Sequence, residues 1–175
     1  MTAVRSRPVD VTTWSLEMRS RDAFRPAWSD RPDLTVTQAE IPCPEFSRFL
    51  YTSVGGDWYW CDRLRWNYAK WQTYLNNPGL QTWVAYVRGT PAGYVELLHE
   101  PDNQNSIQIA YFGLLNAFIG QGIGKHLLSV GIDKAWEMGG DRVWVHTCSL
   151  DGPYALKNYE ARGFRCYETC THVEQ

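Results

Sequence analysis

The chain lacks the features that mark membrane-spanning, secreted and nucleic-acid-binding proteins. None of its apolar runs approaches the roughly 18 residues of a membrane span, and its first residues lack the apolar core of a signal peptide. Lys and Arg number 17 against 19 Asp and Glu, so the net charge of -2 gives no general attraction to nucleic acid or an anionic membrane. We therefore expect a cytosolic protein that binds neither nucleic acid nor membrane.

The cysteines do not fit a disulfide framework or a structural zinc site. They number five, which is odd, and no two of them form a Cys-x-x-Cys pair. They are Cys43, Cys61, Cys148, Cys166 and Cys170. We expect reduced thiols, no metal site, and one domain spanning 1–175, because this length is enough to bury a proper core.

The chain is rich in tryptophan and carries one glycine-rich segment. Its nine tryptophans concentrate between Trp58 and Trp83. The segment from Gly113 to Leu128 passes from an apolar strand pattern, through alternating glycines, to a helical pattern. Residues without Cβ let the backbone approach an anion, and the free N–H groups of a helix N-terminus point at it. The segment therefore predicts a phosphate cradle for a nucleotide cofactor.

The spacing of the glycines argues against the two commonest nucleotide motifs. A Rossmann Gly-x-Gly-x-x-Gly pattern meets Leu127 or Lys125 at its third glycine position, depending on where it starts. A P-loop pattern meets Ile119 at its first glycine and His126 at its Ser/Thr position. The Rossmann match is weak and the P-loop match fails.

Two segments carry a resemblance to a known family. Residues Ile119 to Gly124, Ile-Gly-Gln-Gly-Ile-Gly, resemble the Arg/Gln-x-x-Gly-x-Gly/Ala motif of the Gcn5-related N-acetyltransferase (GNAT) superfamily, which binds the pyrophosphate of acetyl-CoA. Ile119 departs from that motif by replacing its Arg or Gln. Residues Asn158 to Phe164 resemble the superfamily's Tyr-x-x-x-Gly-Phe segment. The resemblance implies that acetyl-CoA is the cofactor and that backbone N–H groups provide most of the contacts that bind it. The residues concerned are Gln121, Gly122, Ile123, Gly124 and Lys125, the last of which adds a positive charge.

Hydrophobic periodicity predicts an α/β fold with a mixed sheet. The predicted strands span Val9 to Leu16, Thr35 to Ile41, Gln81 to Val87, Ala92 to Leu98, Ile107 to Leu115, Arg142 to Cys148 and Phe164 to Val173. The predicted helices span Glu45 to Tyr51, Asp62 to Asn76, Lys125 to Met138 and Pro153 to Ala161. The second helix is expected to bury the stripe Leu64, Tyr68, Trp71 and Leu75, and the third the face Leu127, Leu128, Gly131, Ile132 and Ala135.

This order agrees with the GNAT fold, a mixed, mainly antiparallel central sheet with flanking helices and a strand–glycine loop–helix cofactor site. The resemblance implies that 81–175 forms the acetyl-CoA-binding core. It also implies that 1–80 supplies N-terminal strands and a helical substrate lid, and that a homodimer is a family-level expectation.

The resemblance implies two groups that act on the thioester. Tyr159 lies at the position of a tyrosine that protonates the departing thiolate, although a ring that only packs beneath the sheet is the alternative. The family stabilises the thioester oxygen with a backbone N–H at a bulge, which falls here within Phe112, Gly113 and Leu114. Gly113 permits the bulge, and the N–H of Leu114 is the favoured donor.

The general base has two candidates. Many relatives carry a glutamate where this chain has Gln108, which cannot accept a proton. Glu96 shares a strand face with Tyr94 and Leu98, and apolar surroundings would raise its pKa, unless it is simply exposed. His146 is a rival base or relay, and a chain of water molecules is a third route.

The remaining site predictions concern the pantetheine arm and the acceptor. Asp151 accepts hydrogen bonds from pantetheine amides or caps the following helix, and Asn158 is assigned to the cofactor site. The aromatic residues assigned to the acceptor are Tyr51, Trp58 and Tyr59, whose rings suit a cationic amine, with Glu96 beside them. Arg63 suits a substrate carboxylate. Filling the core of a lid is the alternative for these rings.

The sequence thus predicts an N-acetyltransferase that moves an acetyl group from acetyl-CoA to the primary amine of a small molecule, by direct attack in a ternary complex. Cys148 as an acyl carrier is the less favoured mechanism. Acetylation of a protein or peptide amine is an alternative activity, and a non-catalytic acyl-CoA sensor is an alternative class.

Overall fold

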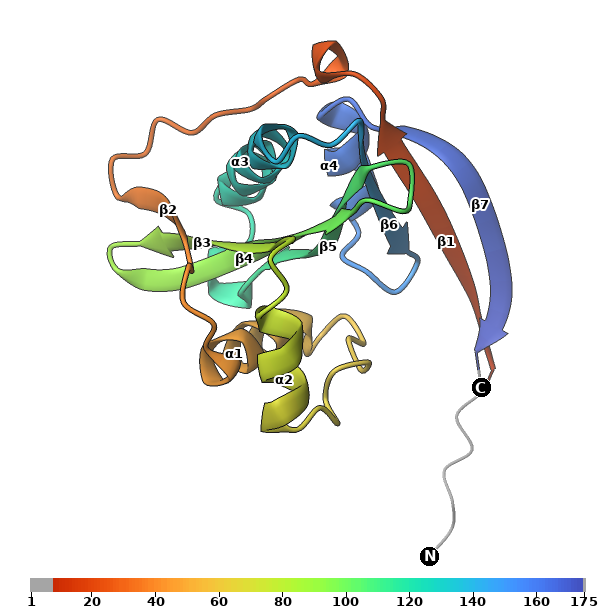
Figure 1. The fold of residues 1–175 in the computed structure, drawn as a ribbon. Helices are drawn as coiled ribbons and strands as arrows, with labels where there is room; N and C mark the ends of the chain where they lie inside the picture. The colour runs from red at the N-terminus through yellow and green to blue at the C-terminus, as the bar shows by residue number, and fades with distance from the viewer. Residues whose placement is uncertain (1–7, 175) are drawn as a thin grey trace, which may run out of the picture.

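A seven-stranded sheet forms the centre of the molecule in the computed structural model, which describes residues 8–174 (Figure 1). Its strand order is β2-β3-β4-β5-β6-β1-β7. The strands are β1 (Val9–Met18), β2 (Leu34–Gln38), β3 (Leu80–Val87), β4 (Thr90–Glu100), β5 (Ser106–Leu114), β6 (Arg142–Cys148) and β7 (Arg165–Glu174). Neighbouring strands are antiparallel except β5 and β6, which are parallel. The predicted mixed, mainly antiparallel sheet is confirmed.

Helices cover both faces of the sheet (Figure 1). The α-helices are α1 (Pro44–Gly55), α2 (Tyr68–Leu75), α3 (Ile123–Glu137) and α4 (Ala155–Ala161), and two short 3-10 helices are η1 (Arg21–Ala23) and η2 (Asn116–Phe118). Helices α1 and α2 lie on one face and α3 and α4 on the other. The five residues predicted to form the inner face of α3 are all buried. As expected, α3 is the crossover that joins the parallel strands β5 and β6.

The N-terminal strand lies inside the core sheet. β1 pairs with β6 from Thr13 opposite Cys148 to Met18 opposite Val143, and its other edge pairs with β7 (Figure 1). Leu16 and Met18 are buried in the main core together with residues of α3. The strand is therefore part of the sheet that carries the glycine loop, although it is distant from that loop in sequence.

The predicted second helix is shorter than expected. It begins only at Tyr68, because the side chain of Asn67, not that of Asp62, caps it by accepting the Lys70 N–H at 2.9 Å. Of the predicted stripe, Trp71 is fully buried, whereas Leu64 and Tyr68 are 48% and 61% exposed. The predicted buried stripe was therefore wrong at Leu64 and Tyr68, and Leu75 is half-buried.

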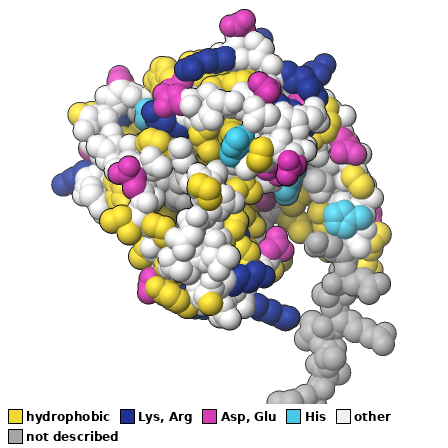
Figure 2. Space-filling view, viewed as in Figure 1, with side chains coloured by type: hydrophobic (Ala, Val, Ile, Leu, Met, Phe, Trp, Pro, Cys, Tyr) yellow, Lys and Arg dark blue, Asp and Glu magenta, His cyan; other side chains and the backbone are white. Residues whose placement is uncertain are grey.

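Neither sign of charge dominates the face of the molecule shown in Figure 2, where acidic and basic side chains are interspersed. Among residues 8–174, no helix is long and apolar enough to cross a membrane. All five cysteines lie within this range and none is in a disulfide.

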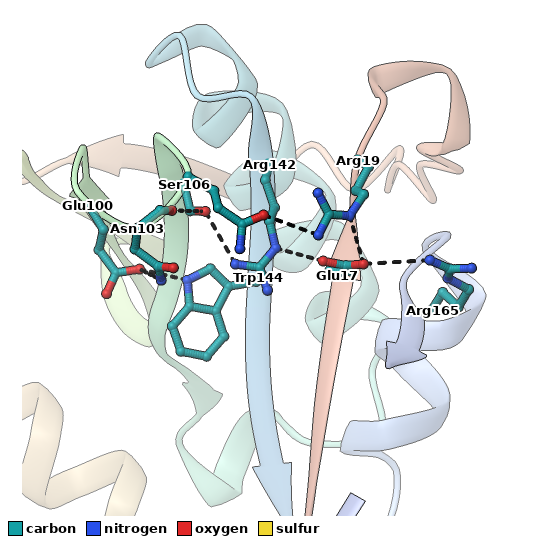
Figure 3. A network of polar contacts seen from close by, with 9 residues as sticks. Glu17, Arg19, Glu100, Asn103, Ser106, Arg142, Trp144 and Arg165 are labelled. Atoms are coloured by element: carbon teal, nitrogen blue, oxygen red, sulfur yellow. Dashed lines mark hydrogen bonds and ion pairs between the residues drawn. The ribbon is translucent and has the colours of Figure 1, made fainter. Parts of the chain in front are cut away.

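A polar network joins β1 to its two neighbours on the face away from α3 (Figure 3). Glu17, only 5% exposed, accepts a hydrogen bond from Arg142 Nε at 2.7 Å and one from Arg19 Nε at 2.9 Å. Arg165 of β7 approaches the same carboxylate at 3.5 Å. Burial acts to raise the pKa of Glu17, but the hydrogen bonds and charges of Arg19 and Arg142 outweigh it and lower the pKa.

We expect the Glu17→Gln variant to lose about 3 kcal/mol of unfolding free energy at neutral pH, because it leaves the buried Arg142 without its charge partner. Because the folded-state pKa is lowered, the stabilisation is present above the unfolded-state pKa. It is lost as the pH falls through the folded-state value, which lies below the ordinary glutamate pKa. Urea unfolding at neutral and acid pH measures both effects. Glu168→Gln, an exposed glutamate of β7, is the control, and equal losses in the two variants would contradict the assignment.

Candidate active site

The two parallel strands stop pairing part-way along their length, and the unpaired stretch between them is called the opening. β5 and β6 pair only at Ser106 with Arg142, Ile107 with Val143 and Gln108 with Trp144. Beyond these pairs β5 continues to Leu114 and β6 to Cys148 without a ladder between them. Backbone groups on the facing edges of the two strands are therefore available to a bound molecule.

A bulge in β5 lies at the point of separation. The register with β4 pairs Glu96 with Tyr111 but Leu97 with Ile109, so Ala110 is the extra residue. The bulge was predicted at Phe112 to Leu114, which was wrong by two residues or more. Gly113 serves a different purpose, since a Cβ there would lie 2.5 Å from Cγ1 of Val54 in α1.

The end of β5 presents N–H groups toward the opening. The N–H of Leu115 donates to the Ala92 carbonyl on β4 at 2.9 Å. Because successive residues of a strand alternate, the N–H groups of Leu114 and Phe112 point away from β4, toward the side where β6 has separated. This orientation fits the predicted oxyanion donors.

The glycine loop, which comprises residues 119–124, leads into α3, and no side chain covers its backbone at Gly120. Gly120 and Gly122 have φ values of 82° and 76°, a conformation that favours glycine, and Gly122 is the N-cap of α3. A Cβ on Gly120 would meet no atom within 4 Å, and one on Gly122 would meet only Lys125 Cε at 3.5 Å. The first turn of α3 carries no acidic residue, so the loop has the properties of an anion site.

The sequence did not predict that the segment between η1 and β2 would lie along the start of α3. Arg31 Nη1 donates to Oε1 of Gln121 in the glycine loop at 2.9 Å. The N–H of Ser29 donates to Nδ1 of His126 at 3.0 Å, and burial lowers the pKa of His126, which favours the neutral ring that accepts this bond. No motif in the sequence marks these contacts.

Tyr159 is buried on α4 beside β5. Its ring makes edge-to-face contacts with Phe112 and Phe164, with centroids 6.0 and 5.9 Å apart. Among residues 8–174 its hydroxyl has no hydrogen-bond partner. Burial, with a smaller contribution from the charge of Asp151, raises its pKa, so the phenol stays protonated. The hydroxyl can therefore donate a proton.

Asp151 closes the turn after β6. Its Oδ2 accepts from Thr147 Oγ1 at 2.7 Å and from the Cys148 N–H at 2.9 Å. Helix α4 begins at Ala155, after Tyr154, so the alternative that Asp151 caps this helix was wrong. Asn158, also assigned to the cofactor, lies half-buried within α4, one residue before Tyr159.

The structure brings Glu96 and Arg63 together. Arg63 Nη1 and Nη2 donate to the two oxygens of Glu96 at 3.0 and 2.9 Å, and the Tyr74 hydroxyl donates to Glu96 as well. Burial acts to lower the pKa of Arg63, but the charge and hydrogen bonds of Glu96 outweigh it and raise the pKa. The predicted base and the predicted carboxylate clamp are thus hydrogen-bonded to each other.

The other acceptor residues take three different positions. Tyr51 is buried at 1% exposure, and its hydroxyl accepts the Arg63 N–H at 3.3 Å, whereas Tyr59 is 72% exposed. The Trp58 ring lies 3.7 Å from the position that a Cβ would take on Gly152, just after β6. Trp58 therefore lies near the opening.

His146 is exposed on β6. Val143 and Val145 of the same strand are in the core with α3, so alternation turns His146 toward the opposite face, where α1 and α2 lie. Its ring centroid is 5.9 Å from that of Trp144.

Comparison with known proteins decides the family. The model of the acetyltransferase (GNAT) family matches residues 36–164. The chain belongs to the acetyltransferase (GNAT) family. No curated protein sequence matched it.

Solved structures share the GNAT fold at low identity. A GCN5-related N-acetyltransferase from Kribbella flavida has a TM-score of 0.66 and 17% identity, covering 93% of this chain and 57% of that one. The aminoglycoside acetyltransferase meta-AAC0020, from an uncultured soil metagenomic sample, has a TM-score of 0.58 and 21% identity, and the match covers 74% of this chain and 87% of that one. The IAA acetyltransferase from Bacillus cereus has a TM-score of 0.55 and 22% identity, and the match covers 77% of this chain and 79% of that one. The GNAT chain spans only 52% to 64% of the length of several larger matches.

Proposed function

We propose that this GNAT chain is an N-acetyltransferase that moves an acetyl group from acetyl-CoA to the primary amine of a small molecule, by direct attack in a ternary complex. One arrangement carries the proposal. The opening between β5 and β6 has the uncovered glycine loop at the end of β5 and the unpartnered hydroxyl of Tyr159 beside it. An anion site and a proton donor at one opening are what thioester chemistry requires.

The residues of the opening fit acetyl-CoA. The N–H groups of residues 121–125 and the side chain of Lys125 would hold its pyrophosphate, and the exposed Ile119 adds no polar contact. Both hydrogen bonds to Asp151 end at Oδ2, which leaves Oδ1 for an amide N–H of the pantetheine arm, with Asn158 on the adjacent helix. Acetyl-CoA supplies an acyl group activated as a thioester.

The chain's own groups would assist the transfer at the thioester oxygen, the departing sulfur and the acceptor nitrogen. The N–H groups of Phe112 and Leu114 face the oxygen that becomes negative, and Tyr159 gives its proton to the departing sulfur. Glu96 already accepts bonds from Arg63 and Tyr74. We therefore assign the removal of the ammonium proton to His146, directly or through water, because it is exposed on the face where α1 and α2 lie.

The test is a turnover screen that measures thiol release from acetyl-CoA with panels of simple amines, amino acids, polyamines and aminoglycosides. Aminoglycosides are included because the fold of one neighbour so named is similar. We expect thiol release that depends on the amine and an acetylated amine as the product. Tight binding of acetyl-CoA without turnover of any primary amine would refute the proposal and favour an acyl-CoA sensor.

A further inference from the structure

Arg63 is a buried charge in an otherwise exposed part of the chain. It belongs to the loop of residues 56–66, between α1 and α2, and is 6% exposed, whereas Asp62, Leu64 and Arg65 beside it are all exposed. Both ends of its guanidinium bind Glu96, which is 2% exposed on β4. A loop that buries its arginine against the central sheet is fixed there more firmly than its exposed neighbours indicate.

Aromatic rings from four elements surround this guanidinium. The distances from Arg63 Cζ to the ring centroids are 4.2 Å for Tyr74, 4.3 Å for Tyr111, 4.8 Å for Trp66, 5.6 Å for Trp71 and 5.9 Å for Tyr51. These rings come from α1, α2, β5 and the loop itself. Electron-rich ring faces stabilise a desolvated cation, so the cage suits a planar guanidinium.

The same loop touches both sides of the opening. Asp57 accepts a hydrogen bond from Asn116 in η2, which follows β5. The Trp58 ring lies over Gly152, which follows β6. The loop therefore reaches from the end of one separated strand to the end of the other, on the face where α1 lies.

We propose that Arg63 is a positioning residue, and that its pair with Glu96 holds the loop of residues 56–66 across the acceptor side of the opening. The acceptor amine then meets Trp58, and the buried ion pair does not touch it. This assignment rests on the proposed acetyltransferase function. It replaces the direct substrate roles predicted from sequence for Arg63 and Glu96 with an indirect one.

The test removes the guanidinium group of Arg63 by mutation and then supplies free guanidinium ion in solution. In Arg63→Ala, we expect the KM for the best amine of the screen to rise about tenfold or more, because the loop is no longer held in position. The Kd for acetyl-CoA should stay within about twofold, since the side chain of Gln121 in the glycine loop bonds Arg31 and Ala117, not residues 56–66. Amide hydrogen exchange should accelerate in 56–66. Guanidinium chloride at millimolar concentration should bind among the aromatic rings and reverse both the rise in KM and the faster exchange. Sodium chloride at the same concentration should reverse neither.

Arg65→Ala is the matched control, because this exposed arginine lies in the same loop and should change neither KM nor exchange. A KM unchanged in Arg63→Ala would overturn the proposal, and so would a parallel rise in the acetyl-CoA Kd, which indicates general damage to the fold. If Arg63→Ala does not fold, Arg63→Lys decides. Lysine keeps the charge but cannot form the two-point contact, so a raised KM with unchanged acetyl-CoA binding supports the proposal and an unchanged KM overturns it.

The two proposals can fail separately. A wild-type protein that acetylates no amine refutes the proposed function through the screen. The exchange measurement with guanidinium still tests whether Arg63 holds the loop, and exchange in 56–66 that is unaltered by Arg63→Ala overturns that anchoring.

Discussion

Tyr159→Phe is expected to reduce kcat by about 10²- to 10⁴-fold, the range associated with loss of a positioned proton donor. The ring would keep its contacts with Phe112 and Phe164, so the fold and the Kd for acetyl-CoA should be unchanged. Steady-state kinetics together with calorimetric titration of acetyl-CoA separate the two quantities. Retained kcat would show that Tyr159 serves packing alone.

The pH profile gives an independent check on Tyr159. Burial raises the pKa of the phenol, so the hydroxyl keeps its proton above the usual tyrosine range. The wild type should therefore lose no activity through this group up to about pH 10. Tyr154→Phe is the matched control, because that tyrosine is 73% exposed at the start of the same helix. An alkaline loss of activity that disappears in Tyr159→Phe would contradict the raised pKa.

Gly122→Val is expected to weaken acetyl-CoA binding by about 100-fold. The new side chain projects into the loop, and losing two hydrogen bonds to a charged phosphate, at about 1.5 kcal/mol each, accounts for that factor. The residue has a φ of 76°, which valine tolerates poorly, so the loop would also shift. Calorimetric titration with acetyl-CoA gives the Kd directly.

Gly139→Val is the control for backbone strain. Gly139 has a φ of 84° just beyond the other end of α3, and a Cβ there would meet no atom within 4 Å. Both variants therefore carry a similar conformational cost, about 1–2 kcal/mol, but only Gly122 lies in the loop. An equal loss of acetyl-CoA affinity in the two variants would show that strain, not occupation of the cradle, weakens binding.

The parts of the molecule that sequence predicted well depend on local patterns. The apolar face of α3, the glycine-rich loop before it and the parallel crossover to β6 all follow from residue spacing over short distances. Alternation along β4 likewise put Glu96 on a face with Tyr94. Local periodicity is reliable where one element packs one face against a sheet.

The remaining features depend on contacts between distant residues. Nothing near Val9–Met18 indicates that its partners are β6 and β7. Arg63 and Glu96 are 33 residues apart, and each suits a substrate role when considered alone. The predicted helix over residues 62–76 is present only from Tyr68 to Leu75, and Arg63 lies in the irregular segment before its cap, Asn67. Only the folded arrangement shows such charges to be paired.

The position of β1 also governs when the sheet can be completed during synthesis. It leaves the ribosome before β6 and β7, its two neighbours, and can pair with them only once they have been made. Until then the core around Leu16 and Met18 lacks Val143, Val145 and Phe164. Such sequence-distant pairing slows folding, so we infer that the sheet assembles from its meander first and closes around the N-terminal strand at the end.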